Sequence, residues 1–206
     1  LQELENAGCL RGVIELVPAA NPIGLAQMFQ ATHQGRFDFS SGKNFNRDFP
    51  NLAAPLIHSL QGQLGDDADS NIELIRQAMR RAISQLPEPQ SQLDGLQRLL
   101  LQHACDADVV LDLHCDFESV MLLYALPQAW PRLQGLAARL EAKAVLLAED
   151  SGGQSFDEAC AAPWLQLAEA FPGTPVPLAC LTATIELGGM ADTEPQRASR
   201  DAEAIL

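Results

Sequence analysis

Positive charge is scarce in this sequence. Lysine and arginine together number 13 against 27 aspartates and glutamates, which gives a formal net charge of −14 at pH 7. A surface that acidic repels phosphate backbones and anionic lipid headgroups, so we expect neither nucleic acid nor a membrane as a partner. No apolar run approaches the roughly 20 residues that a membrane-spanning helix needs.

Cysteines are few and irregularly spaced. There are five, an odd number, with no Cys-x-x-Cys pair among them. A disulfide framework and a cysteine-based zinc site therefore both lack support, and reduced thiols are expected. The chain does not open with a basic segment followed by an apolar one, so nothing predicts export. We expect a cytoplasmic protein.

Length and composition predict one globular domain. The chain has 206 residues, of which 47% are hydrophobic and 19% charged, enough for a sizeable core. It begins at Leu1 and reads there like the last turns of a helix closed by Gly8. We therefore expect residues 1–206 to form a single catalytic-type domain that is truncated at both ends.

Apolar runs alternate with amphipathic segments along the chain. Strands are predicted at residues 12–18, 109–114, 119–126, 144–148 and 179–187, with 109–114 typical of a strand buried on both faces. Helices are predicted at residues 53–64, 92–105, 133–142 and 156–171, from Ser70 as an N-cap with Glu73 completing a capping box, and from about residue 194. This order predicts an α/β fold, with a largely parallel mixed sheet flanked by helices. The irregular stretch 19–52 is of a length that is usually functional.

Two polar residues come at the ends of predicted strands, where α/β folds bind ligands. His114 follows an apolar run and suits a zinc ligand or a general base, or else a hydrogen-bonded core histidine. Glu186 precedes two glycines at the end of the last strand. It must be paired, solvated or catalytic.

A group of basic and polar residues lies in the loop of residues 36–50. Arg36, Lys43 and Arg47 are three of the chain's 13 basic residues, although the protein is strongly acidic. An arginine fork fits a carboxylate, and the amide of Asn46 adds a donor and an acceptor, so the loop suits anion binding. The alternative is a loop held by salt bridges to its own aspartates at 38 and 48.

Taken together, these residues and their order along the chain resemble the succinylglutamate desuccinylase/aspartoacylase family, which belongs with the zinc carboxypeptidases of the M14 type. The resemblance covers essentially the whole chain. It rests on residues 17–24 (VPAANPIG), 44–50 (NFNRDFP), 112–114 (DLH) and 184–187 (TIEL). The loop 150–158 (DSGGQSFDE) also resembles a branch of this family.

The resemblance implies a zinc-carboxypeptidase-like fold and a mononuclear zinc hydrolase. His114 matches a zinc-binding histidine, and Glu186 matches the glutamate that moves a proton from zinc-bound water to the leaving nitrogen. Asn46 and Arg47 match the pair that grips the substrate carboxylate. Arg36 matches, less closely, an arginine that polarises the scissile carbonyl.

The sequence departs from the family at one motif. The family's first two zinc ligands form a His-x-x-Glu motif before the Val-Pro-x-x-Asn-Pro segment, and none of the four histidines here is followed by glutamate at that spacing. Truncation explains this, and we expect the chain alone to bind zinc poorly because one histidine is far short of a ligand set. The family's smaller C-terminal β domain is also absent.

Three functions remain open at this point. The first is a zinc-dependent hydrolase that cleaves the amide bond of an N-acyl amino acid or a related small carboxylate-bearing amide. The second is a zinc carboxypeptidase acting on peptides, and the third is a metal-free relative that only binds carboxylates. The sequence does not fix the acyl group, the amino acid or the oligomeric state, a homo-oligomer included.

Overall fold

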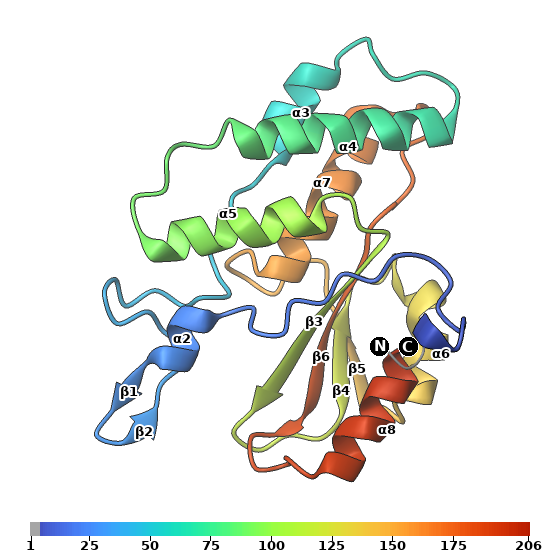
Figure 1. Ribbon diagram of the computed structural model, residues 1–206. Helices are drawn as coiled ribbons and strands as arrows, with labels where there is room; N and C mark the ends of the chain where they lie inside the picture. The colour runs from blue at the N-terminus through green and yellow to red at the C-terminus, as the bar shows by residue number, and fades with distance from the viewer. Residues whose placement is uncertain (1–4) are drawn as a thin grey trace.

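The structure is a computed structural model that describes residues 5–206. Three consecutive helices occupy most of residues 53–104, and strands and helices alternate from residue 122 onward (Figure 1). The elements are α2 Pro22–Ala26, β1 Met28–Phe29, β2 Thr32–His33, α3 Ala53–Leu60, α4 Ala68–Ser84, α5 Gln92–Ala104, β3 Val109–Asp116, β4 Leu122–Ala125, α6 Trp130–Arg139, β5 Ala144–Leu147, α7 Phe156–Ala170, β6 Leu181–Gly189 and α8 Pro195–Ile205.

The main sheet has four strands in the order β3-β6-β4-β5. β3 runs parallel to β6 and β4 runs parallel to β5, whereas β6 and β4 are antiparallel. The predicted α/β fold with a largely parallel mixed sheet flanked by helices is confirmed. Because β6 is the last strand in sequence but lies between β3 and β4, residues about 60 to 70 positions apart pair along its two sides.

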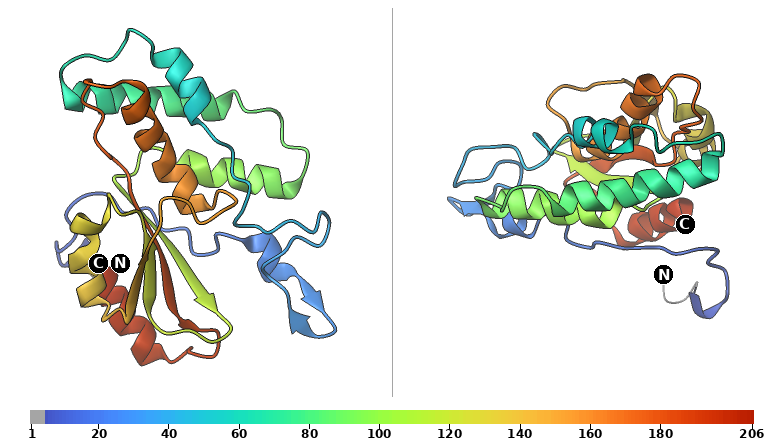
Figure 2. Two further views of the ribbon diagram at one scale, coloured as in Figure 1. Left: turned by 180° about the vertical axis from the view of Figure 1, so that it is seen from behind. Right: turned by 90° about the horizontal axis from the view of Figure 1, so that it is seen from above.

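Two apolar clusters hold the helices to this sheet. One lies among α3, α4, α5 and α7 and includes the fully buried Leu56, Ile75 and Trp164. The other joins the sheet to α6 and the end of α8 and is built around Leu123 and Ile185. Figures 1 and 2 show the two helix groups at different sides of the strands. Among residues 5–206, no helix has the length and apolar character needed to cross a membrane.

Most predicted elements form within a few residues of the expected positions, but the start of α4 differs. The helix begins at Ala68, and Asp67 is its N-cap, whose side chain accepts a hydrogen bond from the Ser70 N–H at 2.8 Å. The predicted cap at Ser70 is therefore wrong. Aspartate caps as well as serine does, and it comes first in this acidic turn.

The strand predicted at residues 12–18 is not formed. The backbone there is irregular, and Val13 is 99% exposed. A short apolar segment makes a strand only where another strand pairs with it, and no pairing to this segment occurs in the described part of the chain. The side chain of Glu15 in this segment contacts the side chain of His103 in α5.

The helix end predicted at residues 1–8 falls partly outside the described residues. Within them, the Gly8 N–H donates to the Glu5 carbonyl at 2.9 Å, and Gly8 has a φ of +66°. This is the left-handed conformation that commonly ends a helix and that glycine adopts without a steric penalty.

Strand β3 is less buried than its sequence indicates. It forms an edge of the described sheet, and Val109 and Leu113 are 48% and 46% exposed. The prediction of burial on both faces is wrong, because an apolar run indicates a tendency to bury but not which strands and helices cover it.

Candidate functional site

Strand pairing brings His114 and Glu186 together. The two residues are direct partners in the parallel register of β3 and β6. Nδ1 of His114 lies 4.0 Å from Oε1 of Glu186. Both residues lie near the carboxyl ends of their strands, the edge at which α/β folds place their ligands.

Asp112 holds the histidine ring from the other side. Residues two apart on a strand point to the same face, so the side chains of Asp112 and His114 meet. Nε2 of His114 lies 2.8 Å from Oδ2 of Asp112. A proton on Nε2 completes this hydrogen bond and leaves Nδ1, which faces Glu186, with a free lone pair.

Asn46 joins this pair to helix α7. Its Oδ1 accepts a hydrogen bond from the Phe156 N–H, the first of α7, at 2.8 Å, and its Nδ2 donates to Oδ2 of Asp112 at 3.2 Å. These two bonds fix which end of the amide is oxygen, and they place Nδ2 3.4 Å from Nε2 of His114. The loop residue therefore serves as a brace between α7 and β3.

Glu186 is a carboxylate with little exposure to solvent. Its side chain is 13% exposed, and its Oε2 is buried without a hydrogen-bond partner in the described part of the chain. Burial raises the pKa of Glu186, and the nearby Asp116 and Asp112 add to the rise against the opposing charges of His114 and Arg36. A buried carboxyl with a raised pKa and a free oxygen suits proton transfer.

The charge of His114 is set by competing effects. Burial lowers the pKa of the imidazole, but the hydrogen bond and charge of Asp112, together with the charges of Glu186 and Asp157, outweigh it. The net result is a pKa above the ordinary value for histidine.

Asp112 and Asp157 belong to this cluster but were not predicted as site residues. Asp157 lies in the first turn of α7, and burial and the charge of Asp112 raise its pKa. Strand alternation could have indicated Asp112, which is two residues before His114. No signal in the sequence indicated that the start of α7 packs against the end of β3.

The basic residues of the loop have no carboxylate partner among the described residues. In residues 5–206, no carboxylate lies within 4 Å of the charged groups of Arg36, Lys43 or Arg47. Asp38 is instead held by the hydroxyls of two serines in its own turn. The alternative of a loop held by salt bridges to its own aspartates is therefore wrong, and the loop's cations stay available to an anion.

The two arginines differ in how they are held. Arg47 is half-buried, and its Nη1 donates to the Asn46 carbonyl at 2.6 Å. Its own carbonyl accepts from the side chain of the buried Gln97 at 2.7 Å. Arg36 is exposed, lies beside the ring of Phe37 and acts on Glu186 through its charge.

The donor set at this position fits a zinc ion in part. Nδ1 of His114 is oriented as a ligand by Asp112, an arrangement common in zinc sites, and the orphaned oxygen of Glu186 lies next to it. Zinc needs three or four protein ligands, and no group of three His, Cys, Asp or Glu residues suited to a metal occurs within residues 5–206. His114 could thus provide one ligand, and the described residues do not complete the set.

Two solved structures share this fold. A succinylglutamate desuccinylase/aspartoacylase family protein from Shewanella amazonensis SB2B superposes with a TM-score of 0.74 and 28% sequence identity. The alignment covers 91% of this chain and 52% of that protein. A succinylglutamate desuccinylase/aspartoacylase from Shewanella frigidimarina NCIMB 400 gives a TM-score of 0.74 and 25% identity over 91% of this chain and 50% of its own.

The chain therefore spans about half the length of these two structures. Comparison with protein-family models and with curated protein sequences gives no match. The resemblance in the sequence and the shared fold agree, and they identify the chain as similar in structure to the succinylglutamate desuccinylase/aspartoacylase family.

Proposed function

We propose that this chain carries part of the active site of a zinc-dependent amidohydrolase that removes the acyl group from an N-acyl amino acid or a similar small, carboxylate-bearing amide. The observation that carries the proposal is the cluster of His114, Asp112, Asn46 and Glu186 from three separate segments. The names of the two structural neighbours support the deacylase type of reaction.

His114 would hold the zinc ion through Nδ1, with ligands from outside residues 5–206 completing the site. Zinc, when bound, supplies Lewis-acid polarisation of the scissile carbonyl and of the attacking water. Asp112 keeps the imidazole in the tautomer and orientation that a ligand requires.

Glu186 would act as the general base. Its raised pKa makes it a better proton acceptor than an exposed glutamate, and its free Oε2 can take a proton from the attacking water. The same carboxyl would then pass the proton to the leaving nitrogen. Arg47 would bind the substrate carboxylate, because its guanidinium meets no carboxylate of the protein in residues 5–206 and can form a bidentate pair.

A substrate panel tests this proposal on the whole protein that contains residues 1–206, purified and loaded with zinc. We expect hydrolysis of N-succinyl and N-acetyl amino acids, measured as release of the free amine. We also expect strong loss of activity when the substrate carboxylate is replaced by an amide. Faster cleavage of the C-terminal residue from peptides would favour a carboxypeptidase. Carboxylate binding without turnover in the zinc-loaded protein would favour a binding protein.

A further inference from the structure

The loop between β5 and α7 packs directly on the segment that carries Arg47. The Asp48 N–H donates to the Gly153 carbonyl at 2.7 Å, and the Phe49 N–H donates to the Gln154 carbonyl at 3.2 Å. The backbone on both sides is unusual, since φ is +88° at Gly153 and +60° at Asp48. Two successive backbone hydrogen bonds therefore join residues 48–49 to residues 153–154, about 105 positions apart in sequence.

Gly153 lies against the side chain of Arg47. A Cβ added at Gly153 would be 2.8 Å from Cδ and 3.5 Å from Nε of Arg47. Carbon atoms in van der Waals contact lie about 3.5–4.0 Å apart, so an alanine there would force the arginine to move. The adjacent Gly152 also has a left-handed backbone, with φ +84°, but a Cβ at that position meets nothing within 4 Å.

Arg47 has little freedom to accommodate such a displacement. Its Nη1 is bonded to the Asn46 carbonyl, and its own carbonyl is bonded to the buried Gln97. The clash would occur in the middle of the side chain, at Cδ, and a shift there changes where the guanidinium fork points. Because Gly153 has no side chain, the guanidinium of Arg47 can take the position observed in the structure.

We propose that Gly153 is a positioning residue that sets the location of the Arg47 guanidinium and thereby the selection of substrates with a carboxylate. The inference rests on the proposed function for its substrate, a small carboxylate-bearing amide. Its structural half, the contact between Gly153 and Arg47, stands independently of that function. Any residue with a Cβ at position 153 would displace the fork, whereas position 152 tolerates one at the cost of backbone strain alone.

The test compares Gly153→Ala with Gly152→Ala in the whole, zinc-loaded protein. Both changes put alanine at a left-handed position and carry the same kind of backbone strain. We expect Gly153→Ala to raise KM for N-acyl amino acids by roughly 10- to 100-fold with a smaller change in kcat, because the displaced fork loses charge-assisted hydrogen bonds to the substrate carboxylate. Gly152→Ala should leave KM within about twofold of wild type. Amidated substrates, which do not need the fork, should show no difference between the two variants.

A double-mutant cycle with Arg47→Ala separates the structural claim from the functional one. Thermal unfolding should show that Gly153→Ala lowers the midpoint more than Gly152→Ala does, and that Arg47→Ala removes this excess. If Gly153→Ala fails to fold, Gly153→Ala with Arg47→Ala should fold, because the clash is with Arg47. An excess that persists without the arginine, or equal KM values for the two alanine variants in an active enzyme, would overturn the inference. If the unfolding cycle behaves as expected and no substrate is cleaved, the failure lies in the proposed function.

Discussion

Replacing Asn46 by alanine tests how strongly its side-chain amide fastens the loop of residues 36–50 to α7 and β3. The change removes the acceptor for the Phe156 N–H at the start of α7 and the donor to Asp112. Loss of a side-chain acceptor at a helix start costs about 1 kcal/mol. A hydrogen bond to a charged group contributes about 1.5–3 kcal/mol at most, and less at 3.2 Å. We expect a loss of about 2–3 kcal/mol in the free energy of unfolding.

The measurement is urea-induced unfolding, with Asn51→Ala as the matched control. Oδ1 of Asn51 accepts a hydrogen bond from the Ala53 N–H at 2.9 Å, a local contact at the start of α3, so its removal should cost only about 1 kcal/mol. Asn46→Asp keeps the acceptor for α7 but sets a second carboxylate beside Asp112. Its penalty should therefore be large at pH 7 and shrink as the pH falls and one carboxyl is protonated. A cost for Asn46→Ala no greater than that for Asn51→Ala would refute the reasoning.

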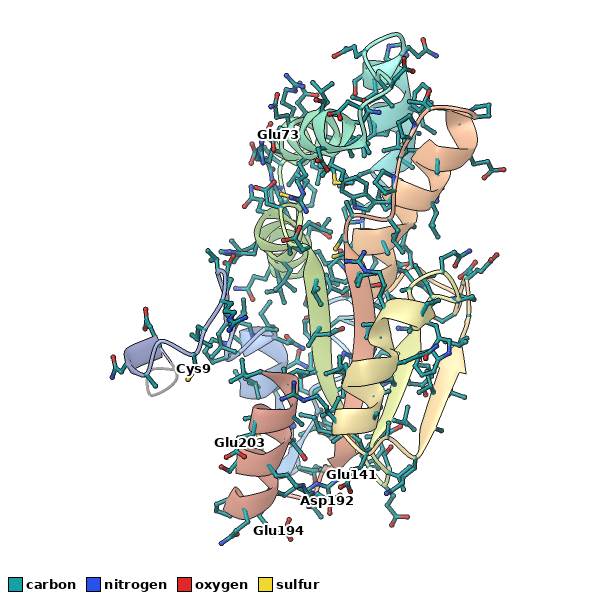
Figure 3. All side chains as sticks on the ribbon, turned by 90° about the vertical axis from the view of Figure 1, so that its right-hand side faces the viewer. Cys9, Glu73, Glu141, Asp192, Glu194 and Glu203 are labelled. Carbon is teal, nitrogen blue, oxygen red and sulfur yellow. The ribbon has the colours of Figure 1, made fainter. Side chains whose placement is uncertain are left out.

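Three further predictions concern charge and burial. Asp112→Asn should weaken zinc binding to the whole protein about 10- to 100-fold, measured by titration calorimetry, because His114 loses its orienting carboxylate. An unchanged zinc affinity would mean that other contacts hold the imidazole ring. Glu186→Gln should raise the melting temperature at pH 7, because a neutral amide avoids the cost of burying an ionised carboxylate. Because the pKa of Glu186 is raised in the fold, its ionised form destabilises the protein at pH values above that folded-state pKa. This penalty disappears as the pH falls below the ordinary value of 4.5, so the gain in melting temperature should vanish near pH 4. Burial raises the pKa of the Cys180 thiol to about 12, so this thiol should resist alkylation in the native protein at pH 8. The exposed Cys9, which lies on a segment apart from the sheet (Figure 3), should be alkylated under the same conditions. Peptide mass mapping would show which of the two cysteines carries the label.

The sequence was informative about local structure and about which polar residues end strands. Residues 109–114 and 179–187 were predicted as strands from their apolar runs, and both form, as β3 and β6. That these two strands are neighbours was not predictable, because strand order depends on the packing of the whole sheet. The 4.0 Å approach of His114 to Glu186 follows from that order and from a register that no local pattern specifies.

The features that local sequence patterns do not predict have a common physical origin. Residues 12–18 have the apolar character of a strand, but they pair with no strand within residues 5–206 and stay exposed. Asn46 was predicted from the resemblance to bind substrate, and its role there stays a prediction. Its hydrogen bonds to α7 and Asp112 depend on long-range packing, as does the contact of Gly153 with Arg47. Local pattern predicts elements, whereas contacts between distant segments require the fold.

The most direct test of the account is the turnover of Glu186→Gln in the whole, zinc-loaded protein. Glutamine keeps the shape of the side chain but cannot accept the proton of the attacking water, and loss of a general base typically costs about 100- to 10,000-fold. We predict a loss of kcat of that size on N-acyl amino acids, with the zinc content measured by atomic absorption equal to that of the wild type. A fully zinc-loaded Glu186→Gln protein with near-normal kcat would contradict the account.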